Sequence, residues 1–167
     1  MLTMAELLAN TAVPGRLDWI GLRPARREPV ISVEQVEAVA GRGLRGDRSA
    51  SRAGSRRQVT LMQAEHLAVI ESCLGGQRAV TAELLRRNLV VSRINVAALR
   101  TSVFHIGDVL LEGTGHCHPC SRMEEALGHG GYNAVRGMGG ITARILEGGT
   151  LLIGAPVTLV QAGKGER

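Results

Sequence analysis

The chain has 167 residues and a formal charge of +5, a size that fits one domain able to bury a core without disulfide support. Three cysteines are too few for a secreted disulfide framework, and their number is odd. The N-terminal residues also lack the basic region followed by an apolar region that marks a signal peptide, so we expect a cytoplasmic protein. No apolar stretch approaches a membrane-spanning length, and three aromatic residues cannot form a base-stacking surface. We therefore expect neither membrane nor nucleic acid as a partner.

Short elements separated by glycines fill the first part of the chain. Residues 2–9 predict a marginal amphipathic helix. Residues 18–22 and 30–40 contain strand-like apolar stretches, and the sequence GRGLRGD at residues 41–47 indicates a glycine-punctuated turn.

The clearest helix follows a buried strand predicted at residues 59–62. It covers residues 64–73, where apolar residues recur three to four positions apart, and a Gly-Gly pair ends it. Thr81 is placed to cap a second helix over residues 81–86, which leads directly into a strand at residues 89–91.

The last third of the chain predicts further strands, with Gly148-Gly149 as a hairpin turn between two of them. These strands cover residues 108–112, 141–146, 151–153 and 157–160. Many short strands, 22 glycines and few helices favour a mainly β, closed or nearly closed barrel with helices outside it. We expect a single domain over residues 1–167, with its core at about 17–160 and a polar, frayed tail at 161–167.

Arginine dominates the basic residues, since Lys164 is the only lysine. Arginine's planar group suits phosphate and carboxylate recognition. Six arginines fall within sixteen residues that contain one acid, Asp47, so this segment is either a solvated loop or a site for an anionic ligand. They are Arg42, Arg45, Arg48, Arg52, Arg56 and Arg57.

A reactive thiol is predicted at Cys120, within the run TGHCHPCSRMEE. Ser121 and Glu124 match a capping box, and Gly128 predicts the end of a short helix. Cys120 then precedes the cap, where unpaired N–H groups, the helix dipole and Arg122 favour thiolate over thiol. Such a thiolate can carry sulfur, attack an electrophile or ligate a soft metal, whereas the alternative is a buried structural cysteine.

Cys117 and Cys120 also match the C-x-x-C pattern of redox dithiols, although the chain lacks the βαβ pattern of thioredoxin-like proteins. With the neighbouring histidines they resemble half of a zinc ligand set. Adjacent side chains of an extended segment point to opposite faces, so only the two cysteines could converge on one ion. The remaining ligands would have to come from His105, His129 or Cys73, and we expect Cys73 to be a core residue instead.

Several short motifs, in this order and spacing, resemble the MOSC domain, which occurs at the C-terminus of molybdenum cofactor sulfurases and in small stand-alone proteins. The resemblance covers roughly residues 17–160. The motifs are Gly43-Leu44-Arg45-Gly46-Asp47, Arg57-Gln58-Val59-Thr60-Leu61, Arg87-Asn88-Leu89-Val90-Val91, Phe104-His105-Ile106-Gly107-Asp108, Thr114-Gly115 through Pro119-Cys120, Gly139-Gly140-Ile141 and Gly148-Gly149.

The resemblance implies a barrel similar to that of pyruvate kinase and one essential cysteine, which corresponds to Cys120. In the family this cysteine is proposed either to ligate the molybdenum of a bound molybdopterin or to carry sulfur as a persulfide, and cofactor-bound members reduce N-hydroxylated compounds. Positions similar to the family's anion-handling residues are Asp47, Arg57, Arg87 and Asn88, with backbone donors near Thr114 and Gly115.

The individual roles of Asp47 and Asn88 stay open. Asp47 would either bind the ligand or orient a loop arginine. Asn88 would either hydrogen-bond a pterin edge or cap the strand that it begins.

Three functional hypotheses remain. A molybdenum enzyme acting on a small molecule would need a separate electron-transfer protein, because no flavin, nucleotide or iron–sulfur motif is visible. A sulfur carrier would receive its persulfide from a pyridoxal-phosphate-dependent cysteine desulfurase, and Cys117 would act as a resolving thiol that releases sulfide. In a basic binding module, Cys120 would be incidental, and His118 would be an exposed loop residue rather than a proton donor.

Overall fold

The computed structural model describes residues 1–163, which form short strands and shorter helices. The strands are β1 (Gly15–Leu22), β2 (Ile31–Val33), β3 (Gln35–Val39), β4 (Gly43–Leu44), β5 (Val59–Gln63), β6 (Leu89–Ser92), β7 (Val103–Ile106), β8 (Val109–His116), β9 (Ile141–Glu147), β10 (Gly149–Leu152) and β11 (Pro156–Gln161). The helices are α1 (Met4–Ala9), α2 (Ala64–Cys73), α3 (Ser121–Leu127) and α4 (Gly131–Val135), with 3₁₀ turns η1 (Arg48–Ser51) and η2 (Val96–Leu99).

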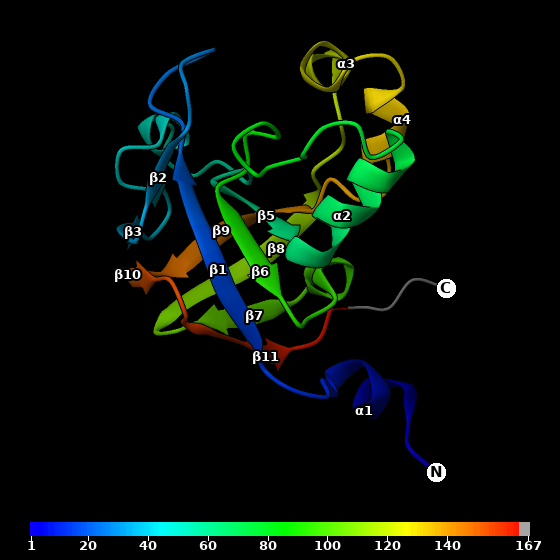
Figure 1. The fold of residues 1–167 in the computed structure, drawn as a ribbon. Coiled ribbons are helices and arrows are strands. Elements are labelled where there is room, and N and C mark those ends of the chain that lie inside the picture. The colour runs from blue at the N-terminus through cyan, green and yellow to red at the C-terminus, as the bar shows by residue number, and fades with distance from the viewer. Residues whose placement is uncertain (164–167) are drawn as a thin grey trace.

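Seven strands close into a barrel in the order β11, β7, β8, β9, β5, β6 and β1 (Figure 1). Closure depends on pairing between β1 and β11, where Gly15 lies opposite Val157. β5 and β6 run parallel, whereas the other neighbouring barrel strands are antiparallel. β2 extends the sheet beyond β1, and β10, β3 and β4 form a second small sheet. The predicted mainly β, barrel-like fold is confirmed.

Apolar side chains fill the barrel interior. Along β7, Phe104 and Ile106 are buried while Val103 and His105 are partly exposed, as expected when alternate side chains face inward. Phe104 lies opposite Leu111 of β8, and both are completely buried. Each such side chain contributes about 1.5–3 kcal/mol. Because the interior is apolar and packed, an ionic ligand must bind outside it.

A second apolar cluster lies between the barrel and helices α2, α3 and α4, which gather at one side in Figure 1. Met62 of β5 and Ile70 of α2 are fully buried there, together with Met123 and Leu127 of α3. This cluster fixes α3 against the sheet, and with it the loop that carries the predicted thiol. No helix within residues 1–163 combines the length and apolar composition needed to cross a membrane.

Most predicted elements are present, with shifted ends. α1 falls within residues 2–9 and has a capping box of Thr3 and Glu6, and α2 covers the predicted residues 64–73. The strand-like segment at 30–40 is divided into β2 and β3. The tail predicted at 161–167 begins with the end of β11, and its residues 164–167 lie outside the described residues.

Three local predictions are wrong. Residues 82–86 form turns instead of a helix, and the segment ends at Arg86, which adopts a left-handed conformation with φ of 54°. Gly148 does not sit in a hairpin, since β9 pairs with β5 and β8 whereas β10 pairs with β3. Cys73 is exposed at the end of α2, because the helix turns that side toward solvent.

Candidate functional site

The predicted reactive cysteine lies in the loop between β8 and α3. Cys117 is buried, and its N–H donates to the carbonyl of Gly140 over 2.9 Å. Cys120 is exposed and occupies the N-cap position of α3, with an extended backbone at φ −127°. The loop therefore offers one shielded and one accessible thiol.

The predicted capping box at α3 is absent. No side chain caps this helix. The carboxylate of Glu124 instead accepts hydrogen bonds from the backbone N–H groups of Tyr132 and Gly130, at 2.9 and 2.8 Å. These two bonds lower the pKa of Glu124 below its usual value. Glu124 thus ties α3 to the start of α4, and the cap position belongs to Cys120 rather than to Ser121.

Two consecutive glycines allow β9 to approach the cysteine loop. Gly140 has φ of 87°, and a Cβ atom there would lie 1.9 Å from the carbonyl oxygen of Leu61. A Cβ atom on Gly139 would lie 2.3 Å from the carbonyl oxygen of Cys117. Only residues without a side chain fit between β5 and the loop, which explains the Gly-Gly pair at this point of the sequence.

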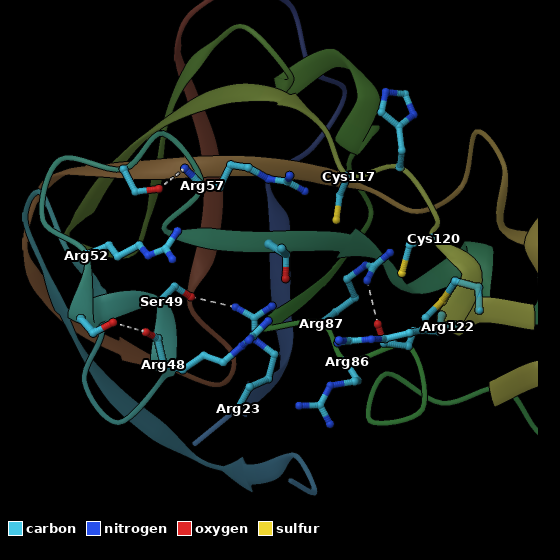
Figure 2. Close-up of a pocket in the computed structure, with 16 residues that line it drawn as sticks. Arg23, Arg48, Ser49, Arg52, Arg57, Arg86, Arg87, Cys117, Cys120 and Arg122 are labelled. Carbon is cyan, nitrogen blue, oxygen red and sulfur yellow. Dashed lines mark hydrogen bonds between the residues drawn. The ribbon is translucent and has the colours of Figure 1, made fainter. Parts of the chain in front are cut away.

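A hollow of about 560 Å³, hereafter the larger hollow, lies beside both thiols (Figure 2). Its volume falls within the usual range of about 300–1,000 Å³ for small-molecule sites. Seven of the sixteen lining residues are arginines and none is acidic. The arginines are Arg23, Arg48, Arg52, Arg57, Arg86, Arg87 and Arg122.

Arg87 has one buried guanidinium nitrogen without a partner. Its side chain donates to the carbonyl of Gly139 through Nε at 2.9 Å and to that of Leu85 through Nη1 at 2.7 Å, while Nη2 has no acceptor. The residue is only 6% exposed, and this burial lowers the pKa of Arg87. The Arg23 and Arg57 charges act in the same direction, whereas negative charge on Cys117 or Cys120 would oppose it. An anion in the larger hollow would supply the missing acceptor.

Asp47 and Asn88 lie behind this hollow rather than lining it. The Asp47 carboxylate accepts three hydrogen bonds from Arg23, at 2.8 to 3.0 Å, and others from Ser49. Asn88 is fully buried and donates to Asp47 and Gly21. Its Oδ1 atom accepts from Arg23 and from the backbone of Thr60, so both polar ends of the amide are used within the protein.

This network orients Arg23, an arginine that the sequence analysis did not single out. Of the two roles left open for Asp47, the described contacts are those of an orienting residue, but its partner lies at the end of β1 rather than in the predicted arginine cluster. Burial alone would raise the pKa of Asp47, but the Arg23 and Ser49 interactions outweigh it and lower that pKa to about 2.

Arg86 and Arg122 also line the larger hollow without having been predicted as site residues. Arg86 donates to the backbone carbonyls of Ala25 and Glu28. Burial lowers the pKa of Arg86, and the charges of Arg23, Arg48 and Arg122 add to the effect. The run Arg86-Arg87-Asn88 contained the available signal, but only Arg87 and Asn88 were predicted at the site, because Arg86 was assigned to the predicted helix over residues 81–86.

A smaller hollow of about 500 Å³ lies on the other side of Cys120. It brings the predicted Thr114 and Gly115 together with Arg57 and Cys120. The Thr114 hydroxyl donates to the carbonyl of Arg56 over 2.6 Å. The predicted residues are thus divided: Arg87 faces the larger hollow, Thr114 and Gly115 the smaller one, and Arg57 and Cys120 both.

The described residues offer no preformed metal cluster of their own. Within residues 1–163, no three His, Cys, Asp or Glu side chains are grouped so that they could hold a metal ion. Cys73, one of the distant ligands considered for zinc, is a free and exposed thiol at the end of α2.

The profile of the MOSC domain family matches residues 48–158 of this chain. The chain belongs to the MOSC family. The match includes Arg57, Arg87 and both cysteines of the loop, but it begins after Arg23 and Asp47. No match was found among curated proteins.

Solved structures share the fold of this MOSC protein at low sequence identity. YuaD from Bacillus subtilis has a TM-score of 0.72 at 16% identity, with 86% of this chain and 94% of that chain covered. YiiM from Geobacillus stearothermophilus has a TM-score of 0.69 at 19% identity, covering 89% and 76%. YiiM from Escherichia coli gives 0.67 at 18%, covering 87% and 69%.

Proposed function

We propose that this MOSC protein binds molybdenum cofactor in the larger hollow, with the Cys120 thiolate as a ligand to the metal. The observation that carries the proposal is that one hollow is lined both by an accessible thiol and by Arg87, whose buried Nη2 has no partner. A molybdopterin presents both matching groups, because it bears a phosphate and a metal that favours soft sulfur ligands.

The phosphate would be held by Arg87 and Arg57. Arg87 is fixed by two carbonyl acceptors and keeps its third nitrogen for a ligand, so it needs little reorganisation on binding. Arg57 makes no side-chain hydrogen bond within the described residues, and Figure 2 shows its guanidinium turned toward Cys117. Bidentate contact from Arg57, with Nη2 of Arg87 as a further donor, suits a phosphate dianion.

The metal would meet Cys120, which lies at the rim of both hollows. A bound molybdenum centre supplies two-electron redox chemistry, and family resemblance suggests an N-hydroxylated small molecule as the oxidant. His118 lines both hollows too and is exposed, so it can donate a proton to a substrate bound near Cys120. Electrons would come from a separate redox protein.

Elemental analysis tests this proposal. Protein purified from a host that makes the cofactor should contain near-stoichiometric molybdenum, and Cys120→Ala should lose it. Cys73→Ala is the matched control, because Cys73 is an exposed thiol outside the hollows. Molybdenum absent from the wild type, or retained equally by both variants, would contradict the proposal. Stoichiometric zinc would instead favour the zinc site that the spacing of Cys117 and Cys120 suggested.

A second candidate function is a sulfur carrier, which the presence of Cys117 in the same hollow favours. A cysteine desulfurase would transfer sulfur to Cys120. The Cys117 thiolate would then attack Sγ of the Cys120 persulfide, the sulfur–sulfur bond would break, and hydrosulfide would leave with the electron pair as a Cys117–Cys120 disulfide formed.

Cyanide-releasable sulfur distinguishes this function from the first. Metal-free protein loaded by a desulfurase should release sulfide and form the disulfide, whereas Cys117→Ser should keep its persulfide. If Cys120→Ser loads as much sulfur as the wild type, Cys120 is not the carrier. If that variant retains every measurable activity, a basic binding module is the better description.

A further inference from the structure

The smaller hollow is lined by positive charge that the proposed function does not use. Arg56 and Arg57 lie at its wall, and none of the described residues that line it is acidic. Arg57 also lines the larger hollow, where Figure 2 shows its guanidinium turned toward Cys117. Arg56 lines the smaller hollow and not the larger one, so its charge is left for a ligand in the smaller hollow.

The segment that carries Arg56 is held against the barrel by hydrogen bonds. The Thr114 hydroxyl of β8 donates to the Arg56 carbonyl over 2.6 Å, and the Gln58 N–H donates to the Ala143 carbonyl of β9 over 3.1 Å. Within the part of the chain that the structure describes, the Arg56 guanidinium itself makes no hydrogen bond or ion pair. Its backbone is thus fixed, while its side-chain donors stay available to a ligand.

The two histidines of the smaller hollow add no negative charge. His116 and His118 are both exposed, and their ring centres lie 5.3 Å apart. Two neutral imidazoles can ligate a divalent metal ion. However, the charges of Arg56 and Arg57 oppose a cation here, and no carboxylate among the described lining residues compensates them. This charge pattern favours a small anion instead.

We propose that the smaller hollow binds the carboxylate of a small organic substrate, with Arg56 as its main partner. A guanidinium matches a carboxylate through two parallel hydrogen bonds, so one arginine suffices for a singly charged ligand. The rest of the substrate would then extend toward Cys120, which lines the same hollow. This inference rests on the proposed function, because it names the substrate class of the same site: an N-hydroxylated compound that also carries a carboxylate.

Alkylation of Cys120 in metal-free protein tests carboxylate binding without any catalytic activity. The thiolate attacks the methylene carbon of iodoacetate or iodoacetamide and iodide leaves, but only iodoacetate carries a carboxylate. The ratio of the iodoacetate rate to the iodoacetamide rate should be at least tenfold higher at Cys120 than at Cys73, an exposed thiol outside the hollows. Arg56→Gln should lower the ratio at Cys120 at least fivefold.

Two control variants separate a contact with Arg56 from the general positive field of the molecule. Arg52→Gln removes an arginine that lines only the larger hollow, and Arg42→Gln removes an exposed one outside both hollows. Each variant should keep at least half of the wild-type ratio. Equal ratios at Cys120 and Cys73 in the wild type would overturn the proposal. An equal loss in Arg56→Gln and Arg52→Gln would also overturn it, because that result means a diffuse field rather than a carboxylate site.

The substrate class is tested with cofactor-loaded protein. Arg56→Gln should raise the KM of a carboxylated N-hydroxylated compound at least fivefold and that of its amide analogue less than twofold. Equal effects on the two compounds would overturn the assignment of the carboxylate to Arg56. Molybdenum retention by Cys120 is measured separately. If molybdenum is absent while the alkylation preference is present, the proposed function fails and the carboxylate site stands.

Discussion

At the residue scale, Asp47 supports Arg23 without itself lining the larger hollow. Its carboxylate is completely buried and holds Arg23 at the edge of the larger hollow. The pKa of Asp47 is lowered from 3.8 to about 2, so the folded state favours the ionised form more than the unfolded chain does. This stabilisation is complete above the unfolded pKa and is lost as the pH falls through about 2.

The free energy of unfolding should therefore decrease by about 2 kcal/mol between pH 5 and pH 1 through Asp47 alone. Asp47→Asn should be less stable at pH 7, because an amide cannot accept from all of these donors, and should lack that part of the pH dependence. Denaturant unfolding across the pH range measures both effects. Asp108→Asn, at an exposed position, is the control, and equal pH slopes for Asp47→Asn and the wild type would refute this role.

Residue identity alone could locate the thiol but not the full set of arginines that line the larger hollow. Cys120, Arg57 and Arg87 were found through motifs, and they lie together at the larger hollow. Arg23 and Arg122 reach the same place through the ends of β1 and α3, positions that depend on contacts across the chain. The motif located Asn88, but its role could not be predicted. In the sequence, an asparagine that is buried with partners inside the protein looks the same as one that binds a ligand.

At the scale of elements, local patterns predicted strands and one helix well and connections poorly. α2 has apolar periodicity, and the Gly75-Gly76 stop lies directly after it in the sequence. The turn before Arg87 depends on Arg86 donating to carbonyls of residues 25 and 28, about sixty positions away. The Gly148 turn depends on a close approach to Ala38, so the next strand joins the second sheet.

The start of β9 is the element on which the cysteine loop depends most directly. Gly140→Ala should destabilise the protein by about 3 kcal/mol or more, because a left-handed alanine costs about 1–2 kcal/mol and its methyl group would collide with Leu61. Gly137→Ala has a similar φ of 77° in open space and should cost about 1 kcal/mol. Denaturant midpoints measure the difference, and similar losses in the two variants would contradict the steric argument.

At the scale of the whole molecule, the contact between β1 and β11 has the fewest paired positions around the barrel. β1 and β11 share two paired positions, and Pro156 there has no N–H to donate, whereas β8 and β9 share six. Native-state hydrogen exchange should therefore show lower protection for the ends of β1 and β11 than for β8 and β9. Uniform protection around the barrel would show that closure is as strong as the rest of the sheet.

The positive charge of the molecule should make its stability depend on anions. A ligand that binds only the folded state stabilises it by about 2.7 kcal/mol at a hundred times its dissociation constant. Pyrophosphate should therefore raise the midpoint temperature, and chloride at matched ionic strength should not. Arg87→Gln should reduce the rise, since its buried Nη2 is the unpartnered donor. An equal rise in that variant would place the anion elsewhere.

The position of Cys120 between two hollows has a kinetic consequence. Seven arginines line the larger hollow, whereas Thr114, Gly115 and His116 line the smaller one. Cys120 lines both hollows. A group anchored in the larger hollow therefore leaves a second approach to Cys120 open. A compound that fills the smaller hollow should therefore slow alkylation of Cys120 from that side without displacing an anion bound in the larger hollow.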